Sequence, residues 1–263
     1  MFHGPGADKW VLKGGQALLV RWETARYSTD VDLLSVEDTT DAAVQALTAA
    51  AALRLDDEIW FAHVSTSAQT HVDRPTRKVV FVAMFENAKL NHLVSVDVVA
   101  SVHRPRGAVT AEPLVPAFST ECAPWPMTWV YPVEDHVADK ICAMYERYRA
   151  GGNTSTRYKD LVDLALFAVK TTMAGADVHR ILWDEVAVRR ARGMVLELPA
   201  AFAAPDPHSW TSGYRSVART VLDLPEELRT LDGVTPLADA FITPLLRSEP
   251  PAGWWRPDER TWR

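Results

Sequence analysis

The sequence predicts an α+β protein, in which an N-terminal domain with a mixed β-sheet is followed by a C-terminal α-helical domain. β-Branched and aromatic runs bounded by turn residues lie before residue 105. Prolines then interrupt the chain between about residue 105 and residue 132, which is typical of a boundary region. Beyond it the apolar residues follow helical spacing. We therefore expect domains at residues 1–120 and 121–263.

The composition is that of a soluble globular protein. The chain has 263 residues, of which 48% are apolar and 24% charged, so it can bury a sizeable core. Its net charge of −6 gives no general attraction to nucleic acid. Cys122 and Cys142 show neither metal-ligand spacing nor a disulfide pattern. Without a signal peptide or a membrane-spanning segment, we expect a cytoplasmic protein that does not contact membranes.

The N-terminal elements follow from local periodicity. Gly14 and Gly15 precede "QALLVRWE", which has the apolar spacing of a helix, and "STDVDLLS" (28–35) then alternates like a strand. The Ala-rich stretch 39–55 predicts a helix, whose start Thr or Asp can cap. Three further runs predict strands, at 59–67, 78–86 and 92–102.

The C-terminal half predicts a bundle of helices. Amphipathic stretches predict helices at 133–149, 156–170 and 177–192, with Asp177 as the cap of the third. Thr235 and Pro236 fit the N-cap and first position of another helix.

The stretch from Gly14 to Asp32 carries the strongest chemical pattern. Residues two apart in a strand share a face, so Asp30 and Asp32 would direct two carboxylates into one space. Carboxylates paired with substrate phosphates are typical ligands of Mg²⁺. Ser28 lies on the same face and offers a hydroxyl to a phosphate. Gly14 and Gly15 would let the backbone approach an anion at the positive end of the following helix.

Simpler interpretations remain open for each part. A lone D-x-D pair is usually a solvated strand face, and Gly-Gly is usually a turn, but their order within about twenty residues favours a triphosphate site. Asp97 lies within the apolar run "VSVDVVA", where an unpaired charge is costly to bury. It would be a third carboxylate for two metal ions, unless it is simply solvated at a strand end.

These residues resemble a known family. "LKGGQALL…RYSTDVDLL" is similar to the first motif of the AbiEii-type (MenT-like) nucleotidyltransferase toxins, a branch of the DNA polymerase β-type nucleotidyltransferase superfamily. Asp97 is similar to the family's apolar-Asp-apolar element, and Lys140 in "DHVADKICAM" to its helical lysine. "RYKDLVDL" (157–164) is similar to its R-x-K-D-x-x-D-L element. The resemblance spans about residues 10 to 170, with the motifs in order.

The resemblance implies a site in a groove that the C-terminal domain completes. The implied catalytic residues are Asp30, Asp32, Lys140 and Asp160. The implied nucleotide-binding residues are Lys13, Gly14, Gly15, Arg26, Ser28 and Asp163. The implied metal ligands are Asp30, Asp32 and Asp97, holding Mg²⁺ in a two-metal site with an NTP as substrate.

Two helices carry the later residues. Lys140 has no carboxylate three or four residues away, and it would steady a triphosphate unless it is an ordinary surface lysine. Asp160 lies one turn from Asp163 and could orient Lys140, bind the base or ribose, or act as a base. Alternatively both are surface acids that pair with Arg157 and Lys159. We expect Asp160 to be the essential one.

The resemblance implies a toxin of a toxin–antitoxin system with a cognate antitoxin. The expected reaction moves NMP from NTP onto the 3′ end of tRNA and blocks translation. The RNA would need a local basic patch, unless these residues are scattered and solvated: Arg147, Arg149, Arg157, Lys159, Arg189, Arg190 and Arg192. Alternative acceptors are a protein or a small-molecule, aminoglycoside-like hydroxyl. A catalytically inactive nucleotide-binding module is the remaining alternative.

Overall fold

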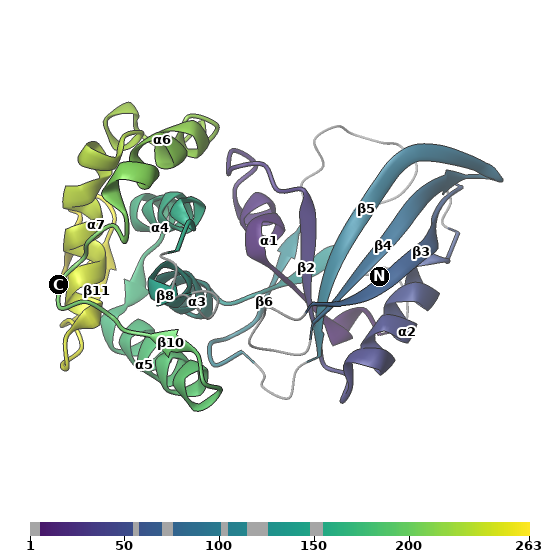
Figure 1. The fold of residues 1–263 in the computed structure, drawn as a ribbon, viewed down its shortest axis with the longest axis horizontal. Helices are drawn as coiled ribbons and strands as arrows, with labels where there is room; N and C mark the ends of the chain where they lie inside the picture. The colour runs from purple at the N-terminus through teal and green to yellow at the C-terminus, as the bar shows by residue number, and fades with distance from the viewer. Residues whose placement is uncertain (1–5, 55–57, 70–75, 101–104, 115–125, 148–154) are drawn as a thin grey trace. The chain divides into compact units, whose positions relative to one another are not determined.

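A computed structural model (Figure 1) describes residues 6–54, 58–69, 76–100, 105–114, 126–147 and 155–263. The expected boundary at residue 120, Cys122 and Arg149 lie outside these ranges. The chain forms two compact units. One comprises Met1–Glu23 and Tyr27–Tyr131, and the other comprises Thr24–Arg26 and Pro132–Arg263. The C-terminal unit thus includes three residues from the segment that precedes Ser28.

A mixed sheet forms the centre of the N-terminal unit. Its described strands are β1 (Trp10–Lys13), β2 (Asp30–Ser35), β3 (Ile59–Gln69), β4 (Thr76–Phe85), β5 (Ala88–Ala100), β6 (Thr110–Pro113) and β7 (Met127–Val130). They are ordered β3-β4-β5-β2-β1-β7-β6. The pairs β2–β5 and β1–β7 are parallel, and the other neighbouring pairs are antiparallel.

Two helices accompany this sheet. The helix α1 (Gly14–Arg21) joins β1 to the segment before β2, and α2 (Thr40–Ala51) packs against the sheet (Figure 1). The hydroxyl of Thr39 accepts a hydrogen bond from the Ala42 amide, so Thr39 caps α2 as its side chain predicts. The core between α2 and the sheet consists of aliphatic and aromatic side chains, including Leu33, Phe81, Val96, Ala43 and Leu47.

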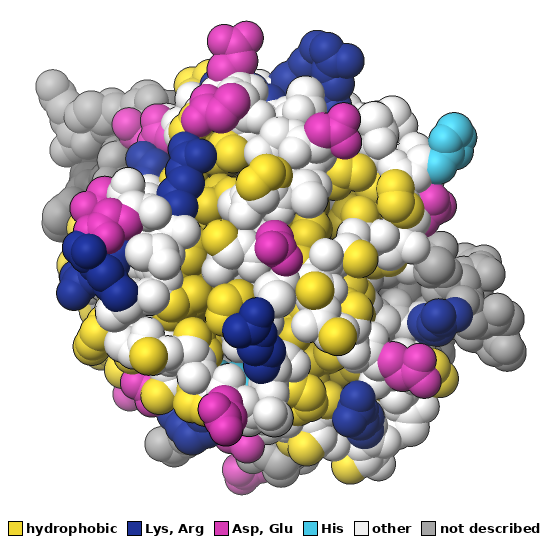
Figure 2. Space-filling model, turned by 90° about the vertical axis from the view of Figure 1, so that its left-hand side faces the viewer, with side chains coloured by type: hydrophobic (Ala, Val, Ile, Leu, Met, Phe, Trp, Pro, Cys, Tyr) yellow, Lys and Arg dark blue, Asp and Glu magenta, His cyan; other side chains and the backbone are white. Residues whose placement is uncertain are grey.

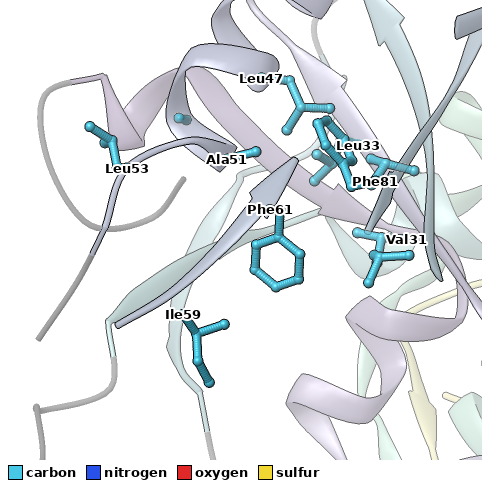
Figure 3. A pocket seen from close by; sticks show the side chains of 11 residues that line it. Val31, Leu33, Leu47, Ala51, Leu53, Ile59, Phe61 and Phe81 are labelled. Atoms are coloured by element: carbon cyan, nitrogen blue, oxygen red, sulfur yellow. The ribbon is translucent and has the colours of Figure 1, made fainter. Parts of the chain in front are cut away.

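The same apolar face contains a cavity of about 210 Å³ (Figure 3). Phe61, Ile59 and Leu53 line it together with Val31 and Leu47. Because Val31 and Leu33 alternate along β2 with the two aspartates, this cavity lies on the face of the sheet opposite to the carboxylates. Its apolar lining does not suit a triphosphate.

The C-terminal unit is a helical bundle with short strands. Its described helices are α3 (Val133–Tyr145), α4 (Tyr158–Lys170), α5 (Gly175–Ala191), α6 (Pro207–Ala218) and α7 (Leu231–Leu246). The short strands are β8 (Glu146–Arg147), β9 (Met173–Ala174), β10 (Val195–Leu196), β11 (Trp254–Arg256) and β12 (Thr261–Trp262). Single 3₁₀ turns lie at Ala7–Lys9 and Glu226–Leu228.

Tryptophans near the C-terminus pack in this unit and fix the end of α4. The fully buried indole of Trp255 donates a hydrogen bond of 2.7 Å to the carbonyl oxygen of Ala168. Its ring lies 4.8 Å from that of Phe241, which stacks on Trp262 at 5.7 Å. The hairpin β11–β12 therefore contacts α4 through an indole hydrogen bond and α7 through aromatic packing.

The predicted α+β class, with its N-terminal mixed sheet and C-terminal helices, is confirmed. Three details of the helices were wrong. The predicted helix 133–149 ends at Tyr145. Asp177 lies inside the first turn of α5, whose N-cap is Ala174. The last helix begins at Leu231, not after Thr235.

The start of α7 shows why the last of these predictions failed. The hydroxyl of Thr230 accepts a hydrogen bond from the Gly233 amide and caps the helix one turn earlier than Thr235 would. Pro236 is then inside the helix, where it removes one backbone hydrogen bond. Among the described residues, no helix is long and apolar enough to cross a membrane.

Candidate active site

Asp30 and Asp32 lie on the polar face of β2. Val31 and Leu33, which alternate with them, pack into the core, so the two carboxylates share the opposite face. In the sheet register, Asp32 lies between Lys13 on β1 and Asp97 on β5. The predicted convergence of Asp97 with the Asp30–Asp32 strand is therefore present in the backbone register.

Lys78 on β4 extends this polar row. It lies opposite Asp97 in the antiparallel β4–β5 pair. Its Nζ is 3.9 Å from Asp97 Oδ1 and 3.6 Å from Asp30 Oδ1. The ammonium of Lys78 therefore lies near carboxylates from two different strands, β5 and β2.

Asp97 is held in place by a second neighbour. The side-chain amide of Gln69 donates a hydrogen bond of 2.7 Å to Asp97 Oδ1. Burial raises the pKa of the Asp97 carboxyl, and the opposing effects of Lys78 and Gln69 do not cancel that rise. Asp97 therefore lies within β5 and not, as the alternative had it, solvated at a strand end.

Gly14 is required by the position of Asp32. Its φ of 61° lies in the left-handed region, and a Cβ there would overlap the Asp32 carboxylate. The sequence predicted that a bound anion would approach the backbone at Gly14. In the structure the side chain of Asp32 occupies the space beside Gly14. Gly15 is buried in the first turn of α1, and Lys13 at the N-cap position makes no side-chain capping hydrogen bond. The carboxylate of Asp32 therefore lies against the start of α1, the end of a helix that favours negative charge.

The loop before β2 is tied to α1. The side-chain amide of Gln16 donates a hydrogen bond of 2.9 Å to the carbonyl oxygen of Ser28. The hydroxyl of Ser28 donates to the carbonyl oxygen of Asp30 at 3.3 Å. Lys13 Nζ lies 4.1 Å from the centre of the Tyr131 ring, a cation–π contact. The bond from Gln16 fixes the backbone that carries Ser28 close to the first turn of α1.

In the C-terminal unit, Lys140 is buried between two carboxylates. Its Nζ donates to Asp163 Oδ2 at 2.5 Å and to Asp160 Oδ1 at 3.2 Å. Arg26 binds Asp163 through two hydrogen bonds of 2.8 Å, and Arg157 Nε donates to Asp160 at 2.5 Å. We call these five residues the Lys140 cluster. Three cations and two carboxylates leave it with a net positive charge.

The cluster overturns the surface alternatives for these residues. Lys140 is 6% exposed, and Asp160 and Asp163 are each 1% exposed, so none is a solvated surface group. Asp160 does pair with Arg157, but Asp163 binds Arg26 and Lys140, and no bond to the exposed Lys159 is present among the described contacts. The partners of Lys140 come from α4 and not from its own helix.

The charge of Asp160 is strongly stabilised. Burial acts to raise the pKa of this carboxyl, but the charges of Arg157 and Lys140 outweigh it and hold the pKa well below its ordinary value. A carboxylate with so low a pKa is a weak proton acceptor. Of the roles left open for Asp160, orientation of Lys140 is the one that its contacts support.

One member of the expected basic patch, Arg189, is not at the surface. Arg189 is buried in α5, where it binds Glu185, Glu146 and Asp139 at 2.9, 2.7 and 3.4 Å. Figure 2 shows the face of the helical unit formed around α7, on which charges of both signs are interspersed. Arg189 therefore belongs to the interior and not to a surface for RNA.

The acidic face of the N-terminal unit fits a hard divalent cation. Asp30 and Asp32 supply carboxylate oxygens from one strand face, and the ammonium of Lys78 shows that a positive charge is accommodated beside Asp30 and Asp97. Within the described ranges, no three histidine, cysteine or acidic side chains approach closely enough to form a complete metal cluster. A metal ion here would complete its coordination with water, or with oxygen atoms of the substrate.

Sequence reasoning missed Lys78 and Gln69. A signal for Lys78 was present, because β4 and β5 are consecutive strands joined by the short turn at Glu86 and Asn87. An antiparallel pair with that turn puts Lys78 and Asp97 on one face by parity. Gln69 carries no such signal, since its contact depends on the end of the long strand β3.

Comparison with known proteins gives one family and several similar folds. The family "Nucleotidyl transferase AbiEii toxin, Type IV TA system" matches residues 1–256. The nucleotidyltransferase toxin MenT4 from Mycobacterium tuberculosis is 18% identical, with a TM-score of 0.48, over 83% of this chain and 77% of its own. A putative nucleotidyltransferase from Helicobacter pylori is 15% identical, with a TM-score of 0.45, over 90% of this chain and 86% of its own.

JHP933 from Helicobacter pylori is 16% identical, with a TM-score of 0.45, over 90% of this chain and 83% of its own. No curated protein sequence gives a significant match. The family match covers both units and all the residues of the acidic face and the Lys140 cluster. The chain therefore belongs to the AbiEii family of nucleotidyltransferase toxins of type IV toxin–antitoxin systems.

Proposed function

We propose that this nucleotidyltransferase uses Mg²⁺ to transfer a nucleoside monophosphate from an NTP onto the 3′ end of tRNA, and thereby blocks translation in the cytoplasm. Membership of the family implies an NTP substrate and a cognate antitoxin. The observation that carries the proposal is the shared polar face of Asp30 and Asp32, with Asp97 in register on the next strand.

The carboxylates are proposed as the metal ligands. Asp30 and Asp32 would hold one Mg²⁺, and Asp97 would complete a second position. Bound Mg²⁺ supplies charge neutralisation for the triphosphate and for the pyrophosphate that leaves. Gln69 keeps the Asp97 carboxylate oriented on the face that Asp32 also occupies.

The first turn of α1 is proposed to bind the phosphates. Gly14 and Gly15 present backbone amides at the positive end of the helix, and Ser28 adds a hydroxyl from a loop tied to the same helix. Lys13, which precedes the glycines and lies over Tyr131, adds positive charge at this end of the sheet. These donors suit the oxygens of a triphosphate.

The Lys140 cluster is proposed to contribute the cation that steadies the transferring group. Asp160 and Asp163 fix the ammonium of Lys140, and Arg26 fixes Asp163. Because Arg26 and Asp163 bind each other, we propose that they act on the nucleotide through Lys140. A cation held by carboxylates costs little reorganisation when charge develops in the transition state.

The proposed reaction is a nucleotidyl transfer, in which one bond forms and one bond breaks at the α-phosphorus of the NTP. The acceptor hydroxyl oxygen forms a bond to the α-phosphorus, the bond from that phosphorus to the bridging oxygen breaks, and pyrophosphate leaves. The hydroxyl proton is released to a base or to water. The family's toxin character favours an acceptor whose blockage stops growth, and the 3′ end of tRNA is such a group.

The proposal is tested by incubating the purified protein with labelled NTPs, Mg²⁺ and cell extract, then separating RNA, protein and small molecules. We expect label in tRNA with the wild-type chain, and none with Asp32→Asn or Lys140→Met. Lys89→Met, at an exposed position at the start of β5, is the control and should transfer normally. Label in protein or in a small molecule would reassign the acceptor. Normal NTP binding without transfer to any fraction would indicate an inactive module.

A further inference from the structure

Lys78 lies where a metal ion and its carboxylate ligands would meet. Its Nζ is 3.6 Å from Asp30 and 3.9 Å from Asp97, two of the three carboxylates proposed as ligands. Lys78 and Asp97 are register partners, so the side chain of Lys78 reaches past the neighbouring strand β5 to β2. Lys78 therefore contacts a carboxylate on β2 in addition to that of its cross-strand partner Asp97.

The charges on this face explain why a cation is held there. Asp30, Asp32 and Asp97 project from one face of two adjacent strands, and their negative charges repel one another unless a positive charge lies among them. Lys78 lowers the repulsion between Asp30 and Asp97 by lying near both. Divalent cations bound at Asp30 and at Asp97 would also neutralise these carboxylates, each with twice the charge of the ammonium.

The ammonium of Lys78 is also able to move away from the two carboxylates. Its side chain is 36% exposed, and its flexible stem can turn the ammonium towards water at little cost. Both ion pairs are longer than a hydrogen bond, so no directional contact locks the ammonium to either carboxylate. Gln69 differs, because its 2.7 Å hydrogen bond fixes Asp97.

We propose that Lys78 is a resident counter-cation of the acidic face, which competes with divalent metal for Asp30 and Asp97 and is displaced when the metal binds. Lys78 is thus a regulatory neighbour of the metal site and not a metal ligand. This inference rests on the proposed function, because it takes Asp30 and Asp97 as metal ligands. It makes metal affinity lower than the carboxylates alone would give.

The test measures Mn²⁺ binding to the full chain without nucleotide, by calorimetry and by the electron paramagnetic resonance signal of unbound Mn²⁺. Lys78→Met removes the charge and keeps the length of the side chain. We expect Mn²⁺ to bind the Lys78→Met chain about two- to fivefold more tightly than wild type, as loss of a competing, partly exposed ion pair requires. Lys78→Arg keeps the charge and should restore an affinity close to that of the wild type.

Arg77→Met is the matched control, because Arg77 is the next residue along β4 and its side chain lies on the other face. Arg77 pairs with Asp41 of α2 at 3.4 Å, so its removal leaves the acidic face unchanged and should leave Mn²⁺ affinity unchanged. An equal gain in affinity for Arg77→Met and Lys78→Met would show a general charge effect, which overturns the inference.

The outcomes separate this inference from the proposed function. If Lys78→Met binds Mn²⁺ with unchanged or weaker affinity, while Asp30→Asn loses binding, the metal site stands and the role of Lys78 is refuted. If the wild-type chain binds no Mn²⁺ at the acidic face, the proposed function fails at its metal site, and the inference falls with it. Circular dichroism of each variant checks that the sheet is formed.

Discussion

Replacing Asp163 by asparagine removes the charge that neutralises two buried cations. In the folded chain Asp163 accepts two hydrogen bonds from Arg26 and one from Lys140. Asparagine has nearly the same shape and keeps one acceptor oxygen, so the change acts mainly through charge. The Lys140 cluster would then hold three cations and a single carboxylate, Asp160.

The expected cost follows from the burial of those cations. Lys140 is 6% exposed, and the Arg26 side chain is 11% exposed. Removing one partner of a buried ion pair costs about 3–5 kcal/mol, because the remaining charge stays buried without compensation. We expect the lower part of that range, since Asp160 still accepts a hydrogen bond from Lys140 at 3.2 Å.

The assay is equilibrium unfolding in urea, followed by tryptophan fluorescence. The fully buried Trp210 and Trp255 report the helical unit. With a slope of about 2 kcal/mol per molar urea, a loss of about 3 kcal/mol lowers the unfolding midpoint by roughly 1.5 M. Asp184→Asn, in an exposed pair with Arg180 at 3.8 Å, is the control and should cost less than about 1 kcal/mol. A loss for Asp163→Asn as small as that of the control would refute the reasoning.

Three further predictions concern backbone, capping and pH. Gly14→Ala should lower both the unfolding free energy and the Mn²⁺ affinity, because the added Cβ overlaps Asp32. Gly193→Ala, at φ 83° in open space, should lower the unfolding free energy by only about 1–2 kcal/mol. Equal unfolding free energies for the two variants would contradict this. Thr230→Ala should cost about 1 kcal/mol as the loss of the α7 cap, and Thr235→Ala less, which urea unfolding of both variants would test. The folded-state pKa of Asp160 lies below its unfolded value of about 3.9, so its contribution to stability is complete above about pH 4 and is lost as the pH falls further. Unfolding midpoints measured from pH 6 to pH 2 should show this fall, and a fall that is no smaller in Asp160→Asn would argue against it.

The sheet shows what local pattern can and cannot predict. The strands β2, β3, β4 and β5 and the helix α2 were predicted because their periodicity lies within one segment of sequence. The strands β1, β6 and β7 were not predicted. Each has four residues, and β1 pairs with β7 through Leu12 and Val130, which are far apart in the chain. Of the prolines that suggested a boundary, Pro113 is the last residue of β6, and Pro126 and Pro132 lie on either side of β7.

The candidate site divides in the same way. The shared face of Asp30 and Asp32 follows from the period of a strand, so it could be predicted from two residues. The partners of Lys140 could not be predicted, because they depend on how α3 packs against α4. They also depend on Arg26, which comes from the N-terminal part of the sequence and binds Asp163. The burial of Asp163 could not be predicted either, since an aspartate one turn from another usually lies on a helix surface.

The most direct test is a crystal structure of the full chain with Mn²⁺ and a non-hydrolysable NTP analogue. Anomalous scattering locates the metal independently of any model of the nucleotide. We predict a manganese peak within coordination distance of carboxylate oxygens from both Asp30 and Asp32, with triphosphate oxygens completing its ligands. A triphosphate bound elsewhere, or a manganese ion that contacts neither aspartate, would contradict the account.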